Sequence, residues 1–424
     1  MKWLLNTFPK AAIRSLHSRF GTRPVSTIAS GLNDAGRVSV RVGSSGNVHI
    51  DLYNLAKVSS SEPLLVYLPP FSTAAPTREL PQLPIFAQRH ATAVIHYRWT
   101  ASSSEEESPK EDSSDVHQAV RENCYPGWPT PLHDTLKAYT WLVENLAPVN
   151  ENPAPTNYGR RDIYVYGSYL GASLATALAL TESHTHERMA VRGCVAYNGI
   201  YNWTMFLPDH GINKPPPAVS RNFLEEILAH SEDSDFQELK KMSRELFSKP
   251  DDFFDPFASP CLLFHTPGLL IPPSFDESAI PHPTTLADLR WVSEEETEEF
   301  VPSMPLKHPR KSSLKFPPAK STLRIPEMLL LHDTAPPLRP SFLRRRQRRT
   351  KKIYGNSFQV QAKELANLTR RSINKYELKE RMKWDDSLDE GNDEADRRVQ
   401  VHHVGLEGHD IATATWLEER MLRR

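Results

Sequence analysis

Polar and apolar residues alternate over two short stretches near the start of the chain. The stretches are residues 37–42 and 47–53, and a Gly-Ser-Ser-Gly link joins them. A period of two places the apolar side chains on one face of an extended strand. Two such stretches on either side of a short glycine-containing link predict a β-hairpin.

After the hairpin the pattern changes to short runs that are almost wholly apolar. Continuous apolar strands are typical of a parallel sheet covered on both faces, and helical stretches between them indicate βαβ crossovers. We therefore predict an α/β fold with an eight-stranded, mostly parallel sheet and helices on both faces. The predicted strands after the hairpin are 64–68, 91–97, 163–166, 191–197, 328–331 and the less apolar 399–404.

The main helices are expected at 131–147, 170–179, 357–374 and 411–424. A long proline-rich insertion, residues 204–323, contains two more candidate helices, at 222–228 and 235–247. It would lie at the carboxyl edge of the sheet, where ligands bind in this architecture, so a lid and a decorative loop both remain open. The acidic link 385–396 is expected to be mobile. We place the core in two parts, 34–203 and 324–424.

The first 33 residues carry lysines, arginines and serines but no acid, since the first acidic residue is Asp34. On a helix, apolar residues such as Leu5 and Leu16 fall opposite Lys10 and Arg14. This is the pattern of a mitochondrial presequence, which predicts a matrix location. The alternative is a disordered basic tail of a cytosolic protein.

Overall composition narrows the function classes. The net charge of −1 gives no general argument for a nucleic-acid partner. The three cysteines form neither a disulfide framework nor a metal-ligand set, and no cofactor is expected. No apolar run is long enough to span a bilayer.

The segment Tyr164–Ala175 carries the main chemical signal. A strand runs into a turn bracketed by Gly167 and Gly171 and continues directly into a helix of small residues. This is the context of a G-x-S-x-G nucleophile elbow, in which the glycines let strand and helix approach closely.

This segment resembles the elbow of the hormone-sensitive-lipase-like α/β-hydrolases (the α/β-hydrolase fold-3 group), whose pattern reads G-D-S-A-G-G-N-L-A. The two glycines, Leu174 and Ala175 match the pattern, and the serine position falls on Tyr169. The resemblance covers roughly residues 60–200 and 324–420. Its other landmarks are Tyr97-Arg98, Trp128-Pro129, the segment Leu132-His133-Asp134, Trp141, Asp255-Pro256 and Ser259-Pro260.

The resemblance implies a carboxylic-ester hydrolase that acts on a small acyl or ester ligand. Its serine is activated by a histidine, the histidine is oriented by a carboxylate, and backbone N–H groups hold the oxyanion. The histidine position falls on His409, in a loop after the last strand and before the last helix. The acid position falls on Pro336, with Asp333 three residues away as a substitute.

Two further positions depart from the family pattern. A tyrosine hydroxyl titrates near pH 10 and reaches further from the backbone than a serine hydroxyl, so Tyr169 is a poor replacement. In the oxyanion loop, Pro69 and Pro70 have no N–H to donate, which leaves Phe71 and Leu170 as the two donors. The leading hypothesis is a catalytically impaired hydrolase-like protein, a pseudoenzyme, that acts by binding.

Two alternatives remain. The first is an active esterase or lipase that uses His409 with Ser168 or Tyr169. The second rests on a basic run at 339–352, which would bind RNA, anionic lipid or an acidic partner and make the chain an accessory subunit of a mitochondrial RNA–protein or membrane-associated assembly. The run also resembles a nuclear localisation signal. Its central cations are Arg344, Arg345, Arg346, Arg348 and Arg349.

Overall fold

The computed structural model describes most of the sheet and its covering helices. The described residues are 35–44, 46–55, 59, 61–71, 83–99, 127–148, 159–207, 210, 212, 234–264, 314–318, 320–333, 356–378 and 392–421. The expected presequence, the helix expected at 222–228, Pro336 and the basic run with its arginines from 344 to 349 all lie outside these residues.

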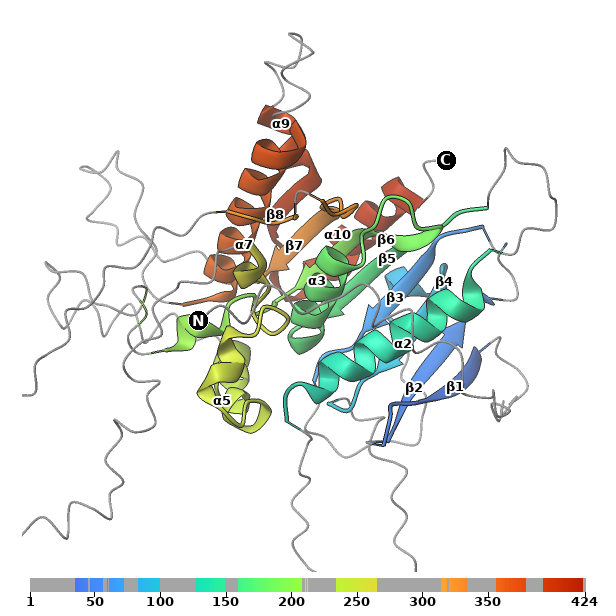
Figure 1. Ribbon diagram of the computed structural model, residues 1–424, viewed down its shortest axis with the longest axis horizontal. Helices are drawn as coiled ribbons and strands as arrows, with labels where there is room; N and C mark the ends of the chain where they lie inside the picture. The colour runs from blue at the N-terminus through green and yellow to red at the C-terminus, as the bar shows by residue number, and fades with distance from the viewer. Residues whose placement is uncertain are drawn as a thin grey trace, which may run out of the picture.

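The described strands form one eight-stranded sheet in the order β1-β2-β4-β3-β5-β6-β7-β8 (Figure 1). β1 and β2 are the predicted hairpin, and β2 also pairs antiparallel with β4, whereas the remaining neighbours are parallel. The predicted α/β fold is therefore confirmed. The strands are β1 Ala35–Arg41, β2 Asn47–Tyr53, β3 Leu64–Leu68, β4 Ala91–His96, β5 Arg161–Ser168, β6 Met189–Tyr197, β7 Glu327–His332 and β8 Val399–His403.

Helices cover both faces of the sheet, as the apolar strands predict. α2, α3, α5 and α7 contribute to the larger hydrophobic cluster, and α10 with the short η2 packs on the opposite face in a second cluster (Figure 1). The helices are α2 Thr130–Leu146, α3 Leu170–Thr181, α5 Ser234–Leu246, α7 Phe358–Ser372, α9 Asn392–Arg398 and α10 Gly405–Met421. The short turns are η2 Ile85–Ala87, η4 Trp203–Phe206, η6 Pro250–Phe254, η7 Pro260–Phe264 and the π-helical η12 Ile373–Leu378.

The described part of the insertion packs into the main core. The α5 residues Phe236, Leu239 and Met242 follow helical spacing and are all buried in the larger cluster. At the end of the same helix, the carbonyl of Leu246 accepts a 2.6 Å hydrogen bond from the N–H of Trp128. The predicted helix at 235–247 is confirmed as α5, where Phe236 packs against the rings of Phe206 and Phe358. Whether the insertion acts as a lid stays a prediction. The domain boundaries at 204 and 323 stay a prediction.

Two expectations near the C-terminus need correction. The last five residues of the link 385–396 belong to α9, whose Asp396 forms an ion pair with Arg370 at 2.9 Å, while residues 385–391 lie outside the described residues. The last helix begins at Gly405, six positions before the predicted residue 411. The family register placed residues 404–410 in a loop. Instead Gly405, at φ 64°, makes the sharp turn from β8 directly into α10.

No helix of the described residues is long and apolar enough to cross a membrane.

Candidate functional site

Tyr169 occupies the turn between β5 and α3. Its backbone has φ 53° and ψ −115°, a conformation that side chains larger than glycine rarely adopt. The N–H of Tyr169 donates a 2.9 Å hydrogen bond to the carbonyl of Tyr197 at the end of β6, which helps to hold the turn. A strained residue between a parallel strand and its following helix is the geometry of a nucleophile elbow. Tyr169 is therefore the elbow residue, as the sequence predicts.

The two glycines that bracket Tyr169 are required by close backbone contacts. A Cβ atom on Gly167 would lie 2.2 Å from the carbonyl oxygen of Gly171. A Cβ on Gly171 would lie 2.3 Å from the carbonyl oxygen of Leu68 in β3 and 2.6 Å from that of Pro69. These distances are far below van der Waals contact, so only glycine lets α3 start this close to the sheet.

The hydroxyl of Tyr169 donates a 2.6 Å hydrogen bond to Oδ2 of Asp235, on the first turn of α5. The ring is half-buried and meets three other rings edge-on, those of Phe71 at 6.1 Å, Tyr197 at 5.9 Å and Phe358 at 6.1 Å. Burial, together with the hydrogen bond to Asp235, raises the pKa of Tyr169 well above its ordinary value. At neutral pH the phenol keeps its proton, which makes it a weak nucleophile.

His409 lies inside α10 rather than in the loop where the sequence placed it. Its ring stacks on the ring of Tyr197, with 4.3 Å between centroids and 9° between planes. Its Nε2 is 3.4 Å from Oδ1 of the neighbouring Asp410. The single hydroxyl proton of Tyr169 goes to Asp235, so it is not available for a hydrogen bond to His409.

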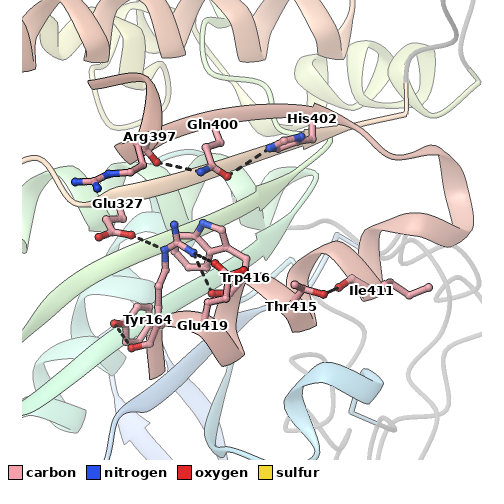
Figure 2. A network of polar contacts seen from close by, with 10 residues as sticks. Tyr164, Glu327, Arg397, Gln400, His402, Ile411, Thr415, Trp416 and Glu419 are labelled. Atoms are coloured by element: carbon pink, nitrogen blue, oxygen red, sulfur yellow. Dashed lines mark hydrogen bonds and ion pairs between the residues drawn. The ribbon is translucent and has the colours of Figure 1, made fainter. Parts of the chain in front are cut away.

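α10, which carries His409, is anchored to the sheet at its other end (Figure 2). Arg420 forms an ion pair with Glu327 at the start of β7, and its guanidinium lies 4.1 Å from the ring centroid of Trp416. The hydroxyl of Tyr164 in β5 donates a 3.3 Å hydrogen bond to the carbonyl of Arg420. These contacts fix the helix along β5 and β7 and so set the position of the histidine.

Asp333, the substitute acid, lies directly after β7 and contacts Tyr197. The Tyr197 hydroxyl donates a 3.1 Å hydrogen bond to its Oδ2. The Asp333 backbone N–H donates a 3.2 Å hydrogen bond to Oδ1 of Asn198. Tyr197 thus contacts both of the groups that a triad would join, His409 through its ring and Asp333 through its hydroxyl.

The expected oxyanion donors, Phe71 and Leu170, both lie beside Tyr169. Leu170 is the first residue of α3, where backbone N–H groups have no partner within the helix. The ring of Phe71 contacts Tyr169, and the loop before it is tied down because the Tyr97 hydroxyl donates a 2.6 Å hydrogen bond to the carbonyl of Pro69. Ser168, the remaining candidate, is the last residue of β5 and is 5% exposed.

Two of the family landmarks turn out to be structural. The side chain of Arg98 donates two hydrogen bonds to the fully buried Asp134 of α2, at 2.8 and 2.7 Å, and its backbone N–H donates a third at 3.0 Å. The indole N–H of Trp128 donates a 2.8 Å hydrogen bond to Asp255, which joins the insertion to the segment directly before α2. Both pairs stabilise the loops at the carboxyl edge of the sheet, and no described contact joins either pair to Tyr169.

Three residues of the site were not found from the sequence. Tyr197 is the last residue of β6, beside the ends of β5 and β7, and Asn198 follows it. Their place at the carboxyl edge of the sheet is the signal that could have found them. Asn198 has φ 50° and is fully buried. Asp235 belongs to the insertion, and nothing in the surrounding sequence predicts a contact with the elbow. No group of three or more metal-binding side chains occurs in the described part of the chain.

The strand order, together with the strained residue between β5 and α3, defines an α/β-hydrolase fold. No protein-family model matches the chain. No curated protein matches it by sequence.

Among solved structures, the chain is similar to several esterases. A hyperthermophilic esterase from the archaeon Pyrobaculum calidifontis is 17% identical with a TM-score of 0.31, over 54% of this chain and 59% of that one. The brefeldin A esterase, a bacterial homologue of human hormone-sensitive lipase, is 14% identical with a TM-score of 0.31, over 59% and 61%. A fungal esterase from Rhizomucor miehei is 15% identical with a TM-score of 0.33, over 55% and 61%. The chain thus spans less than two thirds of each, and the fold assignment rests on its own strand order.

Proposed function

We propose that this α/β-hydrolase-fold protein is related to carboxylic-ester hydrolases, is catalytically impaired, and acts by binding a ligand at its elbow. The observation that carries the proposal is the hydrogen bond from the Tyr169 hydroxyl to Asp235. The hydroxyl proton of Tyr169 is thereby donated to a carboxylate of the insertion.

Ester hydrolysis by such a fold needs three groups in series, because the nucleophile gives its proton to a histidine that a carboxylate orients. Here each group is engaged differently. Tyr169 donates to Asp235, His409 stacks on Tyr197, and Asp333 accepts from Tyr197. The raised pKa of Tyr169 also opposes the deprotonation that an attack would need. These features favour binding over hydrolysis.

The test is to incubate the purified protein with a fluorophosphonate probe and with p-nitrophenyl butyrate. We expect neither covalent labelling nor hydrolysis above that of the His409→Ala variant. Labelling that maps to Ser168 or Tyr169 and disappears on His409→Ala would instead establish the active esterase. Ser168→Ala and Tyr169→Phe, assayed in parallel, identify which hydroxyl reacts.

We also propose that residues 1–33 direct the protein to the mitochondrial matrix, since their basic, acid-free amphipathic pattern supports import. Fusing these residues to a fluorescent protein tests this: we expect mitochondrial fluorescence that is lost when Lys10 and Arg14 are replaced by glutamate. A cytosolic signal from the unaltered fusion would overturn the proposal. An anionic partner for the basic run around Arg344–Arg349 stays a prediction.

A further inference from the structure

Two histidines lie side by side where β7 and β8 end. His332 is the last residue of β7, and it is paired in register with His403, the last residue of β8. Their rings lie 5.5 Å apart between centroids, with 54° between their planes. The two side chains are therefore direct neighbours across the two strands, and if both carried a charge they would repel each other.

The surroundings of the His332 side chain suit only a neutral imidazole. The residue is 2% exposed, and its Nδ1 is buried without a hydrogen-bond partner within the described residues. A protonated imidazole carries an N–H group on both nitrogens. Protonation in place would therefore leave a buried donor without an acceptor and a buried charge without a counter-charge, and both are unfavourable. His403, by contrast, is exposed to solvent.

The charged groups around His332 also oppose its protonation. Burial lowers the pKa of His332 most, and the nearby cations His403 of β8 and Lys363 of α7 lower it further, from 6.5 to about 4. The two nearest acids are engaged elsewhere, since Asp333 accepts from the end of β6 and Glu364 of α7 accepts from the chain after β6. α10 packs on the opposite face of β7. Among the described residues, no acid contributes to this shift.

The backbone of His332 connects this pair to the candidate site. Its carbonyl accepts a 3.0 Å hydrogen bond from the N–H of Val404, the first residue after β8. The next residue, Gly405, turns the chain into α10, which carries His409. Asp333 follows His332 directly along the chain. A movement of β8 away from β7 at this point would therefore change the position of His409.

We propose that the His332–His403 pair is an acid-sensitive switch that holds the end of β8 and the turn into α10 against β7. At neutral pH the buried ring of His332 is neutral and the junction is closed. When the end of β8 separates from β7, His332 reaches water and takes up a proton, so acidification favours the open arrangement and moves His409 away from the ring of Tyr197. The inference goes beyond the proposed function, because it holds whether the elbow binds a ligand or hydrolyses one.

The direction of the effect follows from the two pKa values of His332. The pKa is 6.5 in an open or unfolded chain and about 4 in the folded one, so the open form binds the proton first as the pH falls. The stabilisation is complete above pH 6.5 and is lost as the pH falls towards 4. Between pH 7 and pH 5, His332 alone should raise the unfolding equilibrium constant about 20-fold.

Urea unfolding of the full chain at pH 7, 6 and 5 measures this effect in three variants. His332→Gln removes the buried titrating group and should lose the 20-fold rise. His403→Gln removes one neighbouring cation, so it should show a smaller rise than the unaltered chain. His402→Gln is the matched control, because His402 is an exposed histidine on the same strand, with its Nε2 3.4 Å from Gln400, and this variant should keep the full rise.

Hydrogen exchange of the unaltered chain, compared with the unfolded chain at each pH, locates the opening. We expect β8 and the first turn of α10 to lose protection between pH 7 and pH 5, while the hairpin of β1 and β2 keeps its protection. An equal loss of protection throughout the sheet would overturn the inference, as would the same pH dependence of stability in His332→Gln and the His402→Gln control. The exchange measurement decides the matter even if His332→Gln does not fold.

Discussion

The ring of Tyr197 lies flat against the ring of His409, with 4.3 Å between their centroids and 9° between their planes. The same tyrosine gives its hydroxyl proton to Asp333. A triad would join His409 and Asp333 directly. Here Tyr197 contacts both of them, the histidine through its ring and the carboxylate through its hydroxyl. Restoring a serine at the elbow would not restore the series, and this leads to the first prediction.

Tyr169→Ser should show no hydrolysis of p-nitrophenyl butyrate above the buffer rate. The serine hydroxyl would be at the right distance from the backbone, but Asp333 would still accept from Tyr197. We also expect a loss of about 2 kcal/mol in the free energy of unfolding, because the half-buried ring contacts with Phe71 and Phe358 disappear. Initial rates and urea unfolding are the measurements. Hydrolysis that vanishes on adding His409→Ala would show that the remaining groups already work together.

The second prediction compares two glycines, one with no room for a Cβ atom and one with room for it. Gly171→Ala should destabilise the fold by more than about 3 kcal/mol, because its Cβ would lie 2.3 Å from the carbonyl of Leu68. Gly408→Ala should stabilise it by up to about 1 kcal/mol, because Gly408 lies within α10 and its Cβ would make an ordinary 3.5 Å contact with Val404. Denaturant midpoints of the two variants measure both effects. Equal midpoints would contradict the close approach of α3 to β3.

The sheet could be predicted from the sequence because its apolar runs are short and separated by breakers. Val191–Tyr197, for example, is buried on both faces, so its composition alone indicates a central parallel strand. The elbow was equally predictable, since Gly167 and Gly171 are required by backbone distances that no other residue tolerates. Local constraints of this kind can be recognised in the sequence.

The contacts of the site could not be predicted in the same way. Tyr169 and Asp235 are 66 positions apart, and their hydrogen bond depends on how α5 packs against the core. The position of His409 followed the family register, but its place inside α10 depends on the turn at Gly405. Tertiary packing determines the hydrogen bond and the position of the histidine. The spacing of hydrophobic residues along the chain carries no information about that packing.

The third prediction concerns Gln361, a fully buried side chain of α7 that holds the chain after β6. Its Oε1 accepts from the N–H groups of Tyr201 and Asn202, at 3.0 and 2.8 Å, and its Nε2 donates to the carbonyl of Asn202 at 3.1 Å. Gln361→Met leaves the two N–H groups without a partner, whereas the carbonyl of Asn202 keeps the N–H of Met205 at 3.2 Å, and it should cost about 3 kcal/mol of folding free energy. Gln361→Glu keeps an acceptor for the two N–H groups and should cost less. Urea unfolding ranks the two, and the reverse ranking would contradict the network.

The fourth prediction is a pH dependence of stability that comes from Asp51, which is buried between Arg37 and His96. Burial by itself would raise the pKa of Asp51, but hydrogen bonds from Arg37 at 2.6 Å and His96 at 2.8 Å outweigh it. Together they lower the pKa from 3.8 to about 2. The folded state therefore holds the ionised form more strongly than the unfolded chain does, and the stabilisation is present above pH 3.8 and lost as the pH falls towards 2.

The difference between the two pKa values of Asp51 corresponds to about 2 kcal/mol. Asp51→Asn should lose this stabilisation at neutral pH and should show a flatter stability curve between pH 4 and pH 2. Urea midpoints across that range measure it, with Asp162→Asn as the control because that carboxylate is 27% exposed and pairs with Arg160 at the surface. If the two variants lost stability in parallel with the unaltered chain as the pH fell, the acid sensitivity would belong to other groups. A selective flattening in Asp51→Asn assigns it to the buried contact between β1, β2 and β4.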